Sequence, residues 1–176
     1  MIVFIGYNGS GKTTCAKIME KEYGYKDYQI SSGVKDVARV IFPKIDPELW
    51  EGVVNREWRE EMFKYGKTPR DILKLIGTDM FRKMLDENIW IERLCDIIGD
   101  DIGKISISDC RFTNEMEYIK SRYSNCKFIY VRRNNLIINS NEKYQLESLI
   151  SKCDFTVDND GTIEDLKVSL RDVINL

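Results

Sequence analysis

Short runs of consecutive apolar residues alternate along this chain with longer stretches in which apolar residues recur at every third or fourth position. A continuous apolar run rich in β-branched residues is typical of a strand buried on both faces, as in a parallel sheet. The wider spacing instead places apolar side chains on one face of a helix. The pattern predicts strands over residues 1–6, 104–108, 127–131 and near 154–157, and amphipathic helices over 48–65 and 70–85.

The alternation of strands and helices predicts an α/β fold, in which crossover helices join the strands of a doubly wound parallel sheet. Residues 31–100 contain no further strand pattern, so we expect a helical lobe inserted into a core of residues 1–30 and 101–176. At 176 residues the chain is too short for two ordinary domains. We therefore expect a single domain, 1–176, whose ligand site lies beyond the carboxyl ends of the strands.

Charge and hydropathy limit the partners of this chain. The net charge is −2 and the sequence pI is near 5.4, whereas nucleic acids and anionic membrane surfaces attract broad positive fields. No stretch approaches the roughly 20 apolar residues of a membrane span, and the apolar start of the chain lacks the basic flank of a signal peptide. We expect a cytoplasmic protein that binds neither nucleic acid nor membrane.

The cysteine and histidine content limits the chemistry. Five cysteines lie apart without any C-x-x-C pair, so we expect a reducing compartment and neither a disulfide framework nor a zinc site. The chain has no histidine, which excludes histidine acid–base catalysis and histidine metal ligands. Any reaction must therefore use lysine, arginine, carboxylates and a metal ion.

The first functional motif runs from Gly6 to Thr13 and matches the phosphate-binding pattern G-x-x-x-x-G-K-[ST] between a predicted strand and a predicted helix. Glycines let successive backbone N–H groups turn inward around an anion, and the helix N-terminus adds partial positive charge. Lys12 would reach the β- and γ-phosphates of a bound polyphosphate, and Thr13 would ligate Mg²⁺. The alternative is a chance match at a strand-to-helix turn. The predicted nucleotide-binding residues are Asn8, Gly9, Ser10, Gly11, Lys12, Thr13 and Thr14.

A second informative segment begins where the predicted strand 104–108 ends. Asp109 follows that strand directly, where many phosphate-loop enzymes place the carboxylate that holds a magnesium-bound water or orients the attacking oxygen. Arg111 lies two residues later, so in an extended chain its guanidinium projects to the same side. The alternative is an Asp–Arg pair that only stabilises the loop. We predict catalytic roles for both residues and metal binding for Asp109.

Other motifs separate the classes of phosphate-loop protein. Guanine-specific switch proteins carry an N-K-x-D segment, which this sequence lacks, and the D-x-x-G matches at 100–103 and 158–161 lie where a metal-binding switch would not. Thr162 and Asp165 form a capping box that predicts a last helix. That helix would dock on the sheet through Leu166, Leu170 and Val173.

Beside these motifs, further segments resemble the bacteriophage-type deoxynucleoside monophosphate kinases of the P-loop nucleoside monophosphate kinase superfamily. The similar segments are GVKD (33–36), TPRDILKLIGTD (68–79), NIWI (88–91), SDCRFTNE (108–115) and DNDGT (158–162), and they extend over nearly the whole chain. The resemblance implies Mg²⁺-dependent transfer of the ATP γ-phosphoryl group to a deoxynucleoside 5′-monophosphate. It also implies small-molecule nucleotide partners and, for a viral protein, the host cytoplasm.

Phosphoryl transfer needs cations from several directions, which indicates roles for the remaining basic residues. Lys35, Arg70 and Arg111 are the candidates to bind the acceptor monophosphate. Asn114 and Glu115 would either contact the acceptor or cap the helix that follows them.

The resemblance also implies a lid over residues 132–147. Arg132 and Arg133 would close on the transferring group, although a solvated loop is the alternative. Asn159 would lie in the nucleotide site. The family usually shows His-x-Ser-Glu where this chain reads YQLE (144–147), so that only Glu147 remains as a substrate-binding candidate.

Several alternatives stay open. Base selectivity is not fixed by the sequence, and Trp90 would either stack on a base or, more in keeping with its apolar neighbours, pack in the core. Another small-molecule kinase, of the dephospho-coenzyme A or phosphomevalonate type, and a non-catalytic nucleotide-binding protein are the competing classes. A homodimer is also left open.

Overall fold

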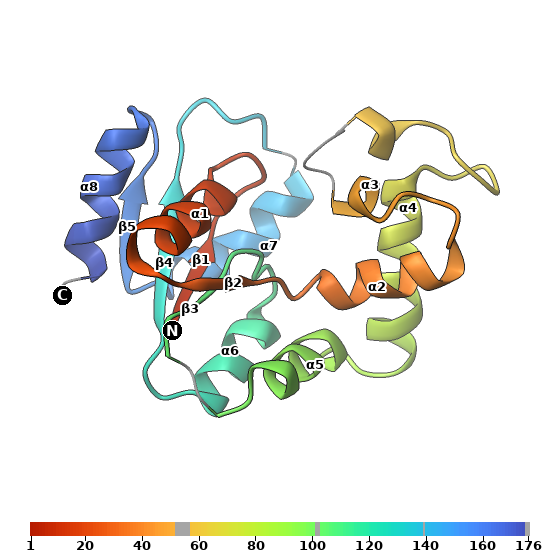
Figure 1. Ribbon diagram of the computed structural model, residues 1–176, viewed down its shortest axis with the longest axis horizontal. Coiled ribbons are helices and arrows are strands. Elements are labelled where there is room, and N and C mark those ends of the chain that lie inside the picture. The colour runs from red at the N-terminus through yellow and green to blue at the C-terminus, as the bar shows by residue number, and fades with distance from the viewer. Residues whose placement is uncertain (52–56, 101–102, 139, 175–176) are drawn as a thin grey trace. The chain divides into compact units, whose positions relative to one another are not determined.

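The computed structural model describes residues 1–51, 57–100, 103–138 and 140–174. By its backbone contacts the chain divides into two compact units (Figure 1). Unit 1 comprises Met1–Gln29 and Cys95–Leu176, and unit 2 comprises Ile30–Leu94. The acceptor-binding role of the helical segment and the lid role of residues 132–147 remain predictions.

Unit 1 is built on a five-stranded sheet in which every pairing is parallel and the strand order is β2-β3-β1-β4-β5 (Figure 1). The strands are β1 (Ile2–Ile5), β2 (Lys26–Tyr28), β3 (Ile105–Ile107), β4 (Lys127–Arg132) and β5 (Phe155–Asp158). Four of them are the strands predicted from apolar runs. The strand β2 was not predicted, because it is short, polar and at the edge of the sheet, where one side needs no apolar partner.

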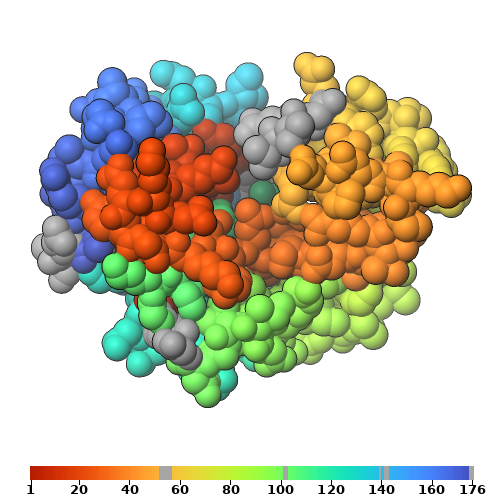
Figure 2. All heavy atoms as spheres, in the orientation of Figure 1, coloured from red at the N-terminus to blue at the C-terminus, as the bar shows by residue number. Residues whose placement is uncertain are grey.

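Helices cover both faces of this sheet, so the predicted doubly wound α/β fold is confirmed. The helices α1 (Lys12–Tyr23) and α8 (Ile163–Ile174) lie on one face, and α6 (Thr113–Arg122) and α7 (Ser140–Ile150) lie on the other (Figure 1). Figure 2 shows the atoms of α1 and α8 side by side. The core between them and the sheet consists of Ile2, Phe4, Cys15, Ala16, Ile18, Met19, Ile129, Val131, Val157, Leu166, Leu170 and Val173.

The start of α8 has the predicted capping box. The Asp165 backbone N–H donates to Thr162 Oγ1 at 3.2 Å, and the Thr162 backbone N–H donates to Asp165 Oδ2 at 2.8 Å. These two bonds satisfy donors that a helix start leaves free. The apolar side chains that follow are buried, as the pattern predicted.

Unit 2 is helical in its described part, with elements α2 (Ser32–Ile41), α3 (Pro47–Glu51), the 3₁₀ helix η1 (Glu57–Glu60), α4 (Pro69–Lys74) and the π-helix η2 (Leu75–Arg82). The helix α5 (Ile89–Ile98) runs from unit 2 into unit 1. The helical stretch predicted over 70–85 is confirmed. None of the described helices is long and apolar enough to span a membrane.

The single helix predicted over 48–65 is wrong for its described part, since α3 ends at Glu51 and residues 61–65 are not helical; residues 52–56 lie outside the described residues. The apolar spacing there reflects an aromatic cluster instead of one helix face. Trp50 and Trp58 have ring centroids 5.2 Å apart, and Phe63 lies 5.8 Å from Trp58. Irregular backbone brings these rings together as well as a helix would.

Trp90 packs in the core of unit 2, which is the core-packing interpretation of the two that the sequence allowed. It is 5% exposed, and its Nε1 donates to the Gly77 carbonyl in η2 at 2.8 Å. A side chain at Gly33 would meet the Trp90 ring at 2.8 Å. Trp90 therefore contacts both α2 and η2. The part of its ring that packs against Gly33 is not available for stacking on a base.

Candidate functional site

The phosphate-binding loop lies between the carboxyl end of β1 and the start of α1. Gly9 and Gly11 have φ angles of 82° and 103°, in the left-handed region that favours glycine. A Cβ on Gly11 would lie 2.1 Å from Asn159 Nδ2. Both the backbone angle and the lack of space thus require glycine at this position, directly before the N-terminus of α1, which is the kind of helix end that binds anions.

Lys12 is 8% exposed and folds back onto its own loop. Its Nζ donates to the carbonyl oxygens of Gly6 at 2.6 Å and Tyr7 at 2.8 Å. These contacts keep a buried ammonium group hydrogen-bonded. The flexible four-carbon stem would allow Nζ to move from carbonyl oxygens to phosphate oxygens, which are stronger acceptors.

Asn159 lies directly against the phosphate-binding loop, although 149 residues separate it from Ser10. Its Nδ2 donates to the Ser10 carbonyl at 2.8 Å, and its backbone N–H donates to the Arg132 carbonyl at 2.8 Å. Ser10 Oγ is buried and has no hydrogen-bond partner in the described part of the chain. A buried hydroxyl of this kind is a donor that an added phosphate oxygen would satisfy.

The two arginines at the end of β4 have different surroundings. Arg132 pairs side-on with Asp158, with Nη2 2.7 Å from Oδ2, and both side chains are about half exposed. Arg133 Nη1 lies 3.4 Å from the Gly9 carbonyl, at the phosphate-binding loop. The next residue, Asn134, donates from its backbone and its side chain to Asp160. The start of the segment 132–147 is thus fixed beside the loop, while Arg132 is engaged with β5.

Glu147 lies farther along, in α7. Its side chain is exposed and lies 3.8 Å from Lys143, one helical turn away. The structure does not bring its carboxylate to the phosphate-binding loop through any contact of the described residues, so its substrate-binding role remains a prediction.

Asp109 and Arg111 follow β3, which pairs with β1, so they leave the sheet at the same edge as the phosphate-binding loop. Asp109 is half-buried and Arg111 is exposed. Glu115 is 4% exposed, and its Oε2 accepts hydrogen bonds from the backbone N–H groups of Arg111 at 2.8 Å and Phe112 at 3.0 Å. This arrangement matches the capping alternative for Glu115. Asn114 is half-buried in the first turn of α6.

Asp27, on β2, is a carboxylate that the sequence analysis missed. Ser106 Oγ donates to Asp27 Oδ1 at 3.0 Å, and Ser108 Oγ donates to Oδ2 at 2.7 Å. The pKa of Asp27 is raised to about 6, chiefly by burial. The two hydroxyl hydrogen bonds lower it, and the negative charges of Asp109 and Glu20 raise it. The alternation Ile-Ser-Ile-Ser over residues 105–108, in β3 and directly after it, was the available signal, because hydroxyls at every second position of a buried segment need a polar partner.

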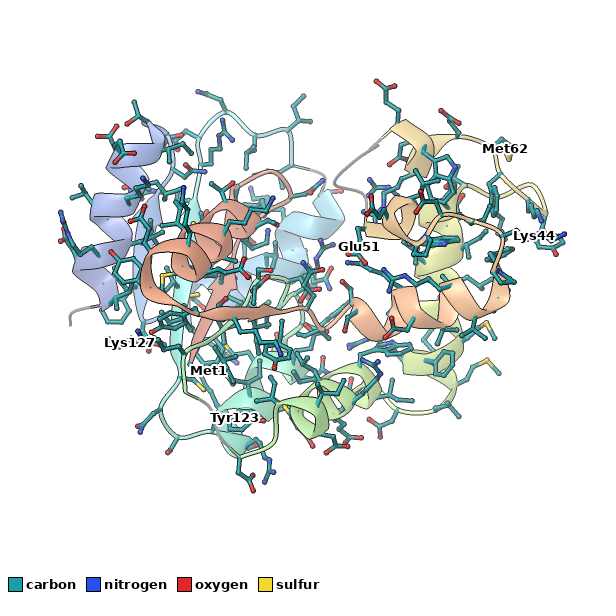
Figure 3. The ribbon with its side chains drawn as sticks, in the orientation of Figure 1. Met1, Lys44, Glu51, Met62, Tyr123 and Lys127 are labelled. Carbon is teal, nitrogen blue, oxygen red and sulfur yellow. The ribbon has the colours of Figure 1, made fainter. Side chains whose placement is uncertain are left out.

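In unit 2 the two predicted acceptor-binding residues pair with different carboxylates. Lys35, in α2, is 5% exposed, and its Nζ donates to Glu51 Oε2 at 2.6 Å. Arg70, in the first turn of α4, is exposed and pairs with Glu60. Glu51, labelled in Figure 3 at the end of α3, also binds Arg39, which no sequence motif had marked.

Comparison with known proteins gives a consistent result. Residues 60–170 match the family model described as deoxynucleotide monophosphate kinase. A protein of Acanthamoeba polyphaga mimivirus, provisionally named a deoxynucleotide monophosphate kinase, is 27% identical over 134 residues, which are 68% of this chain and 68% of that protein. A UPF0200/UPF0201 protein of Archaeoglobus fulgidus is 28% identical over 184 residues, covering 99% of this chain but 54% of that relative.

Solved kinase structures share the fold at low identity. A sugar kinase from Janibacter sp. aligns with a TM-score of 0.55 and 14% identity over 99% of this chain and 93% of that chain. Shikimate kinase from Bacteroides thetaiotaomicron aligns with a TM-score of 0.54 and 13% identity over 99% and 98%. At these identities the likeness shows the fold alone, which is the predicted α/β fold of P-loop kinases.

Proposed function

Because the chain belongs to the deoxynucleotide monophosphate kinase family, we propose that it transfers the γ-phosphoryl group of ATP to a deoxynucleoside 5′-monophosphate. A phosphate oxygen of the acceptor bonds to the γ-phosphorus as the bond from that phosphorus to the β–γ bridging oxygen breaks. The products are ADP and a deoxynucleoside diphosphate. Such a reaction depends mainly on alignment and charge neutralisation, and it needs no histidine.

The observation that carries the proposal is the phosphate-binding loop with its lysine. Gly9 and Gly11 hold left-handed backbone angles, and Lys12 Nζ lies within 2.8 Å of two loop carbonyls. We propose that this ammonium group moves onto the β- and γ-phosphates when ATP binds. Asn159, whose Nδ2 donates a hydrogen bond to the Ser10 carbonyl at 2.8 Å, would stabilise the loop conformation beside the nucleotide.

Mg²⁺ fits the oxygen groups available at this edge of the sheet. The exposed Thr13 hydroxyl and the half-buried Asp109 carboxylate are hard oxygen ligands, and Mg²⁺ usually takes only one or two protein ligands and keeps several waters. No cluster of three acidic or cysteine side chains suited to a metal occurs among the described residues. The ion would neutralise charge on the transferring phosphates.

The acceptor needs its own cations. We propose that Lys35 and Arg70 bind the acceptor monophosphate and that Arg111 is a further substrate-binding cation. Glu115 would act indirectly, by fixing the backbone of Arg111 through the 2.8 Å hydrogen bond to its N–H. Arg132 and Arg133 would bind the transferring group, with Arg132 leaving Asp158 to do so. Asn114 and Glu147 are the further candidates for acceptor contacts.

The test is ADP release from ATP and Mg²⁺ with a panel of acceptors: the four deoxynucleoside monophosphates, their ribose counterparts, dephospho-coenzyme A and phosphomevalonate. We expect turnover with one or more deoxynucleoside monophosphates. Turnover confined to a non-nucleotide acceptor would refute the proposed substrate class. ATP binding without turnover on any acceptor would refute the proposed activity.

A further inference from the structure

A carboxylate of unit 2 lies between two of its cations. Glu51 is labelled in Figure 3. Its Oε2 accepts a hydrogen bond from Lys35 Nζ at 2.6 Å, and its Oε1 accepts one from Arg39 Nη2. Lys35 and Arg39 are one helical turn apart in α2, so their side chains project from the same face of that helix. The Lys35 side chain is 7% exposed, whereas those of Glu51 and Arg39 are 37% and 29% exposed.

Burial alone would raise the pKa of Glu51, but the hydrogen bonds and charges of Lys35 and Arg39 outweigh it and hold that pKa below its usual value. Glu51 is therefore a fixed anion at neutral pH. A nearly buried ammonium such as that of Lys35 needs a nearby anion, because an unpaired charge in such a place is costly.

One hydrogen-bond donor of the Arg39 guanidinium is not used by these carboxylates. Arg39 Nη1 is bonded to Asp36 at 2.8 Å and Nη2 to Glu51, yet Arg39 Nε is buried and has no hydrogen-bond partner in the described part of the chain. The Nε and Nη2 groups form one edge of the guanidinium, which two oxygens of a single anion can bind in parallel. Glu51 uses only half of that edge.

From this geometry we propose that Glu51 holds the place of the acceptor's phosphate: Lys35 and Arg39 form the phosphate-binding site, and the acceptor binds by displacing the Glu51 carboxylate. This inference rests on the proposed function, and it adds Arg39 as a binding residue and Glu51 as a built-in competitor. A phosphate monoester carries more charge than a carboxylate and a third oxygen. It can bind Lys35 and both donors of the open Arg39 edge at once.

The competitor gives the site a specificity for phosphate. A ligand without a phosphate, such as a nucleoside, offers nothing that compensates for breaking the two contacts of Glu51, so it is excluded. A monophosphate replaces those contacts and adds the unused Nε bond. The Glu51 side chain is more exposed than that of Lys35, so it can rotate into water when displaced.

The inference is tested with the whole chain and three variants. The dissociation constant of each deoxynucleoside monophosphate is measured by calorimetry without ATP, and KM and kcat are measured with ATP and Mg²⁺. Removing the competitor in Glu51→Gln is expected to lower the dissociation constant and KM about fivefold, with kcat little changed. Arg39→Gln is expected to raise both about tenfold. The control Glu117→Gln, which breaks the exposed pair with Lys152 in unit 1, is expected to change neither.

Weaker binding by Glu51→Gln would overturn the inference, because it would mean that Glu51 positions the cations instead of competing. Unchanged binding by Arg39→Gln would overturn it as well. Should Glu51→Gln fail to fold, Glu51→Asp serves in its place, since the shorter carboxylate cannot reach both cations and tighter binding is again expected. Failure of the proposed function looks different: monophosphates bind, and bind more tightly to Glu51→Gln, but no variant transfers phosphate to them.

Discussion

The side-chain amide of Asn159 donates a hydrogen bond to the carbonyl of Ser10, at 2.8 Å and across 149 residues of sequence. Asn159 comes directly after β5, and Ser10 lies in the loop after β1. The contact therefore connects the phosphate-binding loop to the end of the edge strand β5. It also fills the space above Gly11, which makes the loop intolerant of any side chain at that position.

A substitution at Gly11 should remove ATP binding. A methyl group there would lie 2.1 Å from Asn159 Nδ2, and the φ of 103° is strained for alanine in any case. The control is Gly24→Ala, at a φ of 71° with no atom within 4 Å of the added carbon, which should cost only about 1 kcal/mol of stability from backbone strain. Calorimetric titration with ATP and thermal unfolding of both variants check this. Equal ATP affinity for the two would contradict the role of the Asn159 contact.

The raised pKa of Asp27 predicts a pH-dependent stability. Its folded pKa of about 6 lies above the ordinary value of 3.8, mainly because of burial, so the folded state binds its proton more tightly than the unfolded state. The free energy of unfolding should thus fall as the pH rises from about 4 to about 6 and stay flat above that. Relative to the wild type, Asp27→Asn should gain roughly 2–3 kcal/mol over this window. Denaturant unfolding at several pH values measures the difference, and a constant difference would contradict the assignment.

Arg132 is expected to act in transfer despite its pair with Asp158. Arg132→Gln should lower kcat at least about tenfold, since the variant loses a cation at the transferring phosphate. Asp158→Asn should leave kcat within about twofold and the melting temperature nearly unchanged, because exposed ion pairs contribute little to stability. Steady-state rates at saturating substrates decide the matter. An unchanged kcat in Arg132→Gln would favour the solvated-loop alternative.

Arg70 is predicted to bind the acceptor and not ATP. Arg70→Gln should raise KM for the deoxynucleoside monophosphate roughly tenfold, with little change in KM for ATP. The matched variant Glu60→Gln removes the partner of Arg70 and keeps the arginine, so it should bind the acceptor at least as well as the wild type. Varying each substrate in turn separates the two constants. An effect confined to ATP would assign Arg70 to the nucleotide site.

The parts of the fold that the sequence predicted are those in which local pattern and burial agree. The strands β1, β3 and β4 are buried on both faces, so their apolar runs were sufficient. The edge strand β2 has no such run. The helix predicted around Trp58 was wrong because its apolar residues meet in an aromatic cluster, and residue spacing alone does not distinguish the two arrangements.

The candidate site was predictable where one continuous segment defines it. The loop around Lys12 and the strand end at Asp109 each occupy a single stretch of sequence. The roles of Asp27 and of the Arg39–Glu51 ion pair depend on contacts between segments that are distant in the sequence, and a local motif cannot predict such contacts. The role of Glu115 as a cap is an intermediate case, because the sequence offered capping as one of two interpretations and the backbone contacts match it.

The central claim is tested most directly by following the label from [γ-³²P]ATP with the wild type and Lys12→Ala. In the presence of Mg²⁺ and the deoxynucleoside monophosphates, the account predicts that the wild type moves the label into a deoxynucleoside diphosphate. Lys12→Ala should fold normally and form at least about a hundredfold less of that product. Label that stays in ATP, label that appears only as inorganic phosphate, or equal product from the folded Lys12→Ala variant would contradict the account.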